Sequence, residues 1–284
     1  MSFVTDPWGW WIEPFTVSDV MVDALIAGLL AVLATSVVGT WVVLRGMSFL
    51  GDALAHGVLP GIAVAFIVGV DLSLGAFVAA LAMVGGINVI RRHSPLPDDT
   101  SIGVLFVGFL ALAVLILSSR SSYAGDLTGF LFGSITGIDA ADLRRQAIAA
   151  AVTVAGIALF YRPLLVMTFD ETQARLLGLR PGLAHAVLLG LVAVSIVASF
   201  RAVGNLLVFA FLVAPPATAA LLVRRVPRMM AASVLVGAGS VLVGLLVSYH
   251  HDTAAGASMA LAAVVAFLGV VAGQASWQAL RSAQ

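Results

Sequence analysis

Two side chains that can bind a metal ion, Asp52 and His56, lie four residues apart within an apolar segment. On a helix this spacing directs both side chains to the same face. An ionisable residue inside a membrane span costs about 2.5 to 3.5 kcal/mol, so two on one face call for a stabilising partner. A carboxylate oxygen and a neutral imidazole nitrogen suit Zn²⁺ or Mn²⁺, and the pair therefore predicts a divalent-cation site.

The residues just after this pair favour close packing and an interrupted helix. Gly57 and Gly61 allow neighbouring helices to approach closely, and Pro60 frees a backbone carbonyl that can face a pathway. A structural alternative stays open from these residues alone. In that alternative Asp52 N-caps its helix and His56 hydrogen-bonds a neighbouring helix.

Composition places these residues in a membrane. Of 284 residues, 61% are hydrophobic and 10% are charged, and the mean hydropathy is +1.12. These values predict an all-α, polytopic transmembrane bundle. The absence of cysteine excludes disulfides, thiolate metal sites and cysteine catalysis. Because all 14 basic residues are arginine, the chain lacks the lysine of a P-loop and does not itself hydrolyse ATP by that machinery.

Apolar runs predict about nine membrane spans, with eight as the alternative, in a single transmembrane domain over 21–284. Residues 1–20, which carry Trp8, Trp10 and Trp11, are expected to lie at the membrane interface. Residues 119–142 are the weakest assignment, because they could form a re-entrant helix or a further span. The nine predicted spans are 22–44, 50–69, 73–90, 101–118, 143–161, 182–200, 203–223, 229–249 and 254–273.

Arginine is distributed unequally between the two sides of this bundle. When the spans alternate, ten arginines fall on one side and four on the other. The positive-inside rule then predicts an extracytoplasmic N-terminus and a cytoplasmic C-terminus. The richer side holds Arg45, Arg91, Arg92, Arg162, Arg175, Arg180, Arg224, Arg225, Arg228 and Arg281.

The polar segment at about 168–180, on the arginine-rich side, has the pattern of a short amphipathic helix. It begins with Asp170 and Glu171, and Gly178 and Pro181 follow as stop signals. A flank that includes Phe169 would fit a groove on a soluble partner. An ordinary surface helix has the same pattern, so the segment alone leaves both readings open.

Two weaker features occur later in the chain. His250, His251 and Asp252 form a second set of potential metal ligands near the outer end of the eighth span, although neighbouring helix residues point in different directions. Interfacial histidines are therefore the favoured reading of this set. Asn205 and Pro215 predict a kinked helix, either for packing or at the transport pathway.

Several separate segments, in order from about residue 22 to 273, are similar to those of the manganese/zinc/iron ABC-importer permease family, the ABC-3 type. The similarity is carried by 45–61 (RGMSFLGDALAHGVLPG), 160–164, 169–171 with Ala174 and Gly178, 202–207, and 214–218. Ordered segments of this kind are more specific than any single motif.

The resemblance implies a homodimeric permease with an architecture like that of type II ABC importers. The family pattern implies that Asp52 and His56 coordinate the transported metal and that 168–180, including Ala174, is the coupling helix. It also implies a cytoplasmic ATPase pair, an extracytoplasmic metal-binding receptor protein and a prokaryotic plasma membrane. No bound cofactor is expected, since the divalent metal is cargo, and the expected surroundings are lipid, with no nucleic-acid partner.

Other functions remain to be weighed against this one. A secondary metal transporter would use an ion gradient, and a permease of the cobalamin or haem class would carry an organic cargo. An intramembrane enzyme is disfavoured, because the chain has no His-Glu-x-x-His motif and no Ser–His pair with obvious spacing. Asp and His ligation suits several ions, so the sequence leaves the physiological metal open.

Overall fold

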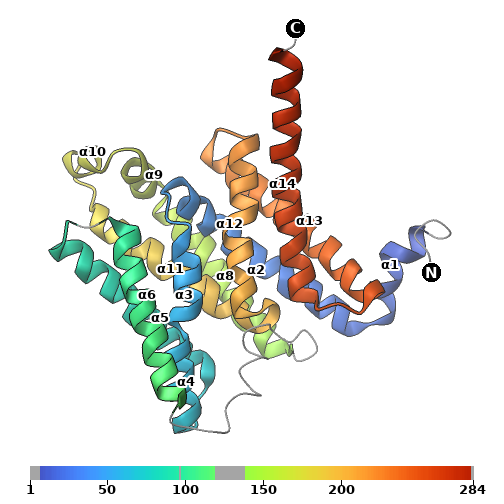
Figure 1. The fold of residues 1–284 in the computed structure, drawn as a ribbon, viewed down its shortest axis with the longest axis horizontal. Helices are drawn as coiled ribbons and strands as arrows, with labels where there is room; N and C mark the ends of the chain where they lie inside the picture. Colours follow the sequence, from blue (N-terminus) through green and yellow to red (C-terminus); the bar gives the residue numbers. More distant parts are fainter. Residues whose placement is uncertain (1–6, 96, 119–137, 283–284) are drawn as a thin grey trace.

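The computed structural model describes residues 7–95, 97–118 and 138–282, and these form a helical bundle (Figure 1). Each long helix satisfies its own backbone hydrogen bonds, as a chain in hydrocarbon must. The helices are α1 (Pro7–Val17), α2 (Asp19–Leu44), α3 (Phe49–Gly57), α4 (Leu59–Val68), α5 (Leu72–His93), α6 (Asp98–Ser118), α8 (Ala140–Leu159), α9 (Tyr161–Phe169), α10 (Glu171–Leu176), α11 (Pro181–Val203), α12 (Asn205–Leu222), α13 (Val226–His251) and α14 (Ala255–Ser282).

The predicted all-α transmembrane bundle is confirmed, and the number of spans agrees approximately. Seven helices of the described residues are long and apolar enough to cross a membrane, or up to eight if α8 and α9, which meet at 63°, count as one span. The seventh predicted span, 203–223, corresponds to α12, Asn205–Leu222. The second predicted span is divided between α3 and α4, which together run from Phe49 to Val68.

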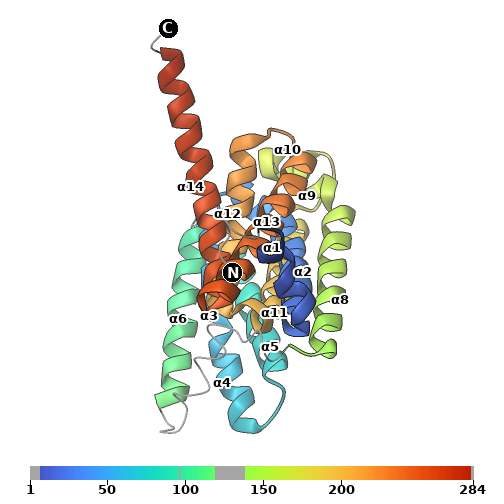
Figure 2. The same cartoon turned by 90° about the vertical axis from the view of Figure 1, so that its right-hand side faces the viewer.

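Helix α2 lies at the centre and packs against α8, α11, α12 and α13. Small residues bring these helices close, as is usual in membranes. A Cβ atom at Gly39 of α2 would overlap the backbone carbonyl of Leu212 in α12. Among the long helices, α6 and α14 are the least buried, and α14 projects beyond the others at the end of the bundle where α9 and α10 lie (Figures 1 and 2).

The junction between α11 and α12 is a single residue, Gly204. Its φ of 94° lies in a region that side-chain-bearing residues rarely adopt, so glycine is required for this sharp break. Asn205 begins α12, and its side chain lies outside the described side chains. Pro215 and Pro216 lie inside α12.

Two uncertain regions of the sequence have partial counterparts. Helix α1 occupies part of the predicted interfacial segment and packs against α2 and α13. Most of the 119–142 segment, namely 119–137, lies outside the described residues. Helix α8 then starts at a capping box, in which the Asp139 carboxylate accepts the backbone N–H of Asp142 at 2.6 Å.

Candidate metal site and coupling surface

Asp52 and His56 lie on one face of α3, as their spacing predicted. His56 Nδ1 is 3.5 Å from Asp52 Oδ1 and 3.1 Å from the Asp52 backbone carbonyl oxygen. The side chains are 32% and 23% exposed respectively, so neither is sealed within the chain. Because α3 starts at Phe49, Asp52 lies within the first turn of the helix and is not its N-cap. Both side chains are therefore partly accessible to a ligand.

The imidazole of His56 is held by an aromatic side chain from another helix. Phe106 of α6 packs edge-on against His56, with ring centroids 5.5 Å apart and an interplanar angle of 89°. Phe106 packs in the same manner against Phe49, at 5.6 Å. This contact restricts the ring of His56, and sequence reasoning missed Phe106 because nothing local to it indicates a partner so distant along the chain.

The helix that carries the pair is interrupted at Val58, two residues after His56. Helix α3 ends at Gly57 and α4 begins at Leu59, with Pro60 in its first turn. Proline has no backbone N–H, so it cannot continue the hydrogen-bond ladder at this point. The break is local, because Val58 keeps helical φ and ψ and α3 and α4 together form one apolar span, Phe49–Val68.

Glycines set the distance between this broken helix and α5. A Cβ atom at Gly57 would overlap the sulfur of Met83, and one at Gly61 would overlap the backbone carbonyl of Gly75. Gly75 in turn faces the carbonyl of Gly61. The backbones of α4 and α5 therefore touch, and larger residues at these positions would push them apart.

The pair by itself provides too few ligands for a transition metal. Within the described residues, no group of three or more His, Cys, Asp or Glu side chains could hold a metal ion. Zn²⁺ and Mn²⁺ ordinarily take at least four ligands in proteins. An ion at Asp52 and His56 would need further donors from outside these residues.

The second set of potential ligands does not gather around one point. His250 stacks on Trp10 of α1, with ring centroids 4.5 Å apart, and its Nε2 is 3.1 Å from the Trp10 carbonyl oxygen, to which it donates. His251 and Asp252 are exposed at the end of α13. This arrangement favours the interfacial reading, in which His250 attaches α1 to the bundle.

The segment predicted to contact a partner, 168–180, holds the end of α9, all of α10 and the turn after it. The Asp170 carboxylate accepts the backbone N–H of Gln173 at 2.9 Å and thereby caps α10. Gly178, with φ of 72°, allows the turn after α10. Ala174 is fully buried against the bundle, whereas the opposite flank is apolar and exposed. The exposed apolar residues are Phe169, Leu176 and Leu177.

An ion pair joins α10 to the end of α5. Arg91 Nη2 is 2.9 Å from Glu171 Oε2, and Arg175 Nη2 is 2.9 Å from Glu171 Oε1. Burial raises the pKa of Glu171, but the hydrogen bond from Arg175 and the charges of Arg91, Arg175 and Arg45 outweigh burial, so this pKa lies below its ordinary value. Glu171 therefore stays ionised. The sequence pattern predicted a role for Glu171 but did not indicate that Arg91, 80 residues away in the chain, is its partner.

Comparison with known proteins identifies the family. A model of the ABC 3 transport family matches residues 17–274. The chain belongs to the ABC 3 transport family. The match includes the Asp52–His56 face and α10, and membership confirms the resemblance seen in the sequence. A member of this family is a transport protein and not an enzyme.

Three relatives show how closely the chain follows other proteins of the ABC 3 transport family. The manganese transport system membrane protein MntC of Listeria monocytogenes is 35% identical, over 86% of this chain and 87% of its own. The chelated iron transport system membrane protein YfeD of Yersinia pestis is 34% identical, over 86% and 82%. The structure of PsaBC from Streptococcus pneumoniae in complex with Fab superposes with a TM-score of 0.80 at 33% identity, covering 92% of this chain and 94% of that one.

Proposed function

We propose that this chain is the permease subunit of an ATP-binding-cassette importer for a divalent transition metal, with Mn²⁺ as the expected cargo. One observation carries the proposal: a carboxylate and an imidazole share one accessible face of an apolar, interrupted helix. Family membership supports transport. The relatives named for manganese and for chelated iron support a transition-metal cargo.

Two copies of the chain would complete the coordination. Asp52 and His56 supply one oxygen and one nitrogen per chain, so a two-fold axis beside α3 would bring two oxygens and two nitrogens together. The partial exposure of both side chains supports a site open to a second copy. Such a mixed set suits Mn²⁺, Fe²⁺ and Zn²⁺, so geometry and supply must select among them.

The exposed flank of α10 would receive the ATPase subunit. Phe169, Leu176 and Leu177 offer an apolar surface of the size that enters a groove on a partner. Glu171 binds Arg91 at the end of α5, so a movement of α10 would be transmitted to that helix. Helix α5 contacts α4 at Gly61 and Gly75, which connects the flank to the helix that follows the metal pair.

Transport then follows from a difference in metal affinity between two packing states. A receptor protein outside the membrane would deliver the ion to Asp52 and His56. Closure of the ATPase pair would move α10 and α5, alter the spacing of the donors and release the ion inward. The chain contributes the binding geometry and the coupling contact, and the ATPase contributes the free energy.

The test is uptake of radioactive Mn²⁺ by vesicles that contain the permease with its ATPase and receptor partners. Asp52→Ala and His56→Ala should each abolish ATP-dependent uptake while assembly with the ATPase is retained. The matched controls His251→Gln and Asp252→Asn change exposed residues of the same types and should transport normally. Uptake by the Asp52→Ala/His56→Ala double variant would refute the site, and uptake without ATP would indicate secondary transport.

Competition among ions identifies the cargo. Excess unlabelled Mn²⁺ should suppress uptake more strongly than equal concentrations of Zn²⁺ or Fe²⁺. Stronger suppression by Zn²⁺ or Fe²⁺ would reassign the metal and leave the site in place. Transport of an organic cobalt or iron chelate in preference to all three ions would reject a bare-ion permease.

A further inference from the structure

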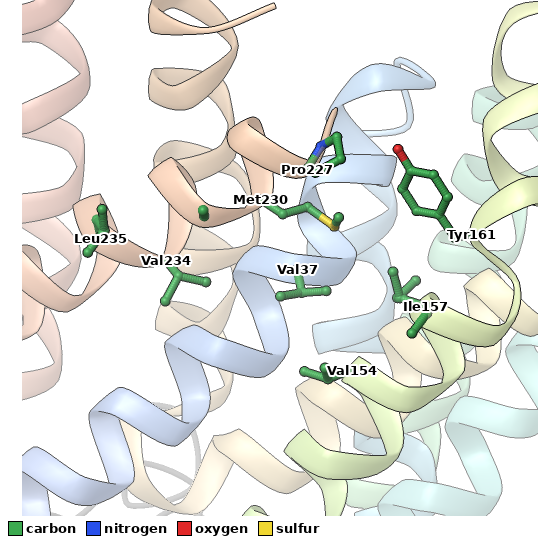
Figure 3. A pocket seen from close by; sticks show the side chains of 10 residues that line it. Val37, Val154, Ile157, Tyr161, Pro227, Met230, Val234 and Leu235 are labelled. Carbon is green, nitrogen blue, oxygen red and sulfur yellow. The ribbon is translucent and has the colours of Figure 1, made fainter. Parts of the chain in front are cut away.

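An apolar groove lies on the surface between α2, α8 and α13, where the proposed transport mechanism uses no residue. Its volume is about 760 Å³, within the range of roughly 300 to 1,000 Å³ typical of ligand sites. Figure 3 shows Val37 of α2, Ile157 of α8, and Met230 and Val234 of α13 around this space. Helices α2 and α13 are long and apolar enough to span a membrane, and α8 forms a bent span with α9, so the groove lies among membrane-spanning helices.

One end of the groove carries a polar group. Tyr161, at the start of α9, packs its ring edge-on against Trp41 at 5.5 Å and lies across from Pro227 (Figure 3). Tyrosine is typical of the boundary between hydrocarbon and headgroups. The rest of the groove, from Ile157 to Leu235, is apolar. Its occupant must therefore be a long apolar group that ends in a polar one.

Three exposed arginines lie close along the chain to the residues at this polar end, and we call them the arginine rim: Arg162, Arg225 and Arg228. Arg162 follows Tyr161 in the chain, Arg228 follows Pro227, and Arg225 lies two residues before Pro227. Among the residues that the structure describes, no acidic side chain pairs with any member of the rim. Unpaired arginines beside a membrane helix attract anionic lipid headgroups.

We propose that this groove is a binding site for an anionic phospholipid. One acyl chain lies between α2, α8 and α13, and the phosphate contacts the arginine rim near Tyr161. A second copy of the chain is a poorer occupant. The metal pair contacts α6 through Phe106, and Figure 2 shows α6 on the opposite side of the bundle from α8. A copy that adds ligands beside α3 would leave the groove facing lipid.

The test is native mass spectrometry of the purified chain after incubation with phosphatidylglycerol or phosphatidylcholine in detergent. The wild type should retain one phosphatidylglycerol per chain. Ala158→Trp fills the groove and should abolish retention, whereas Ala155→Trp, an exposed position on the same helix outside the groove, should not. Arg162→Gln with Arg228→Gln should weaken phosphatidylglycerol binding by about thirtyfold and leave phosphatidylcholine binding unchanged.

The outcomes separate the possible occupants. Equal retention of both lipids by every variant would overturn the proposal, because it would indicate detergent-like annular contact only. Conversion of a dimer to a monomer by Ala158→Trp, with lipid retention unaltered, would also overturn it and assign the groove to a second copy. The arginine variant changes only exposed residues, so it tests the proposal even if the tryptophan variant does not fold.

Discussion

The ion pair between Arg91 and Glu171 is expected to hold α10 against the end of α5. Hydrogen bonds between charged groups contribute about 1.5 to 3 kcal/mol when shielded, and exposed ion pairs about 0.2 to 1 kcal/mol. Arg91 is 19% exposed and Glu171 is 36% exposed, so this pair falls between the two cases. Glu171→Ala should therefore lower the free energy of local opening of α10 by about 1 kcal/mol.

Hydrogen exchange of the purified permease measures this opening directly. A loss of about 1 kcal/mol corresponds to roughly fivefold faster exchange of the α10 amides, with the amides of α2 unchanged. Arg175→Gln is the control, because Arg175 is 71% exposed and its bond to the same carboxylate should contribute little.

A double-mutant cycle with Arg91→Gln and Glu171→Gln separates the interaction energy of the two side chains from the other effects of each substitution. The combined variant should exchange no faster than either single variant, since both remove the same contact. Additive effects, or an effect of Arg175→Gln as large as that of Glu171→Ala, would show that Arg91 does not position α10 and would refute the reasoning.

Three further predictions concern titration, helix packing and the N-terminal helix. The pKa of Glu171 lies below its ordinary value, so the stability that its ionised form contributes is complete above the ordinary pKa and is lost as the pH falls through the lowered pKa. The α10 amides of Glu171→Gln should therefore exchange faster than those of the wild type at neutral pH, and the two rates should become equal in acid. Gly61→Leu should destabilise the permease by about 1 to 3 kcal/mol in thermal unfolding, because it meets a backbone carbonyl of α5, whereas Gly85→Ala, with open space around it, should not. Trp10→Ala removes a stacked ring from His250 and should weaken the packing of α1 on the bundle by about 0.5 to 1.5 kcal/mol. Proteolysis within α1 should therefore be faster, and unchanged proteolysis would contradict this contact.

The sequence was sufficient for features set by local periodicity. The four-residue spacing placed Asp52 and His56 on one face. The acidic start and the glycine stop located α10, although the observed helix, Glu171–Leu176, is shorter than the predicted 168–180. The apolar runs predicted the helices of the bundle because each span must satisfy its own hydrogen bonds.

Features that depend on distant contacts were not predictable from the residues. Arg91 has the sequence context of an ordinary positive-inside loop, and only the fold brings Glu171 to it. Phe106 lies in an apolar span with no mark that distinguishes it from its neighbours, yet it packs against His56. The bend of 63° between α8 and α9, by contrast, has a local cause that the predicted span 143–161 did not take into account. Pro163 has no backbone N–H to bond the carbonyl of Leu159, so the helix breaks at Phe160.

Asp52 and His56 are proposed to bind the transported metal directly. Pulsed electron paramagnetic resonance of Mn²⁺ bound to the purified permease tests this proposal, because a coordinating imidazole couples its nitrogen to the metal. We expect a nitrogen coupling in the wild type and in His251→Gln, and its loss in His56→Gln. A nitrogen coupling that persists in His56→Gln, or wild-type Mn²⁺ coordinated by oxygen alone, would contradict the account.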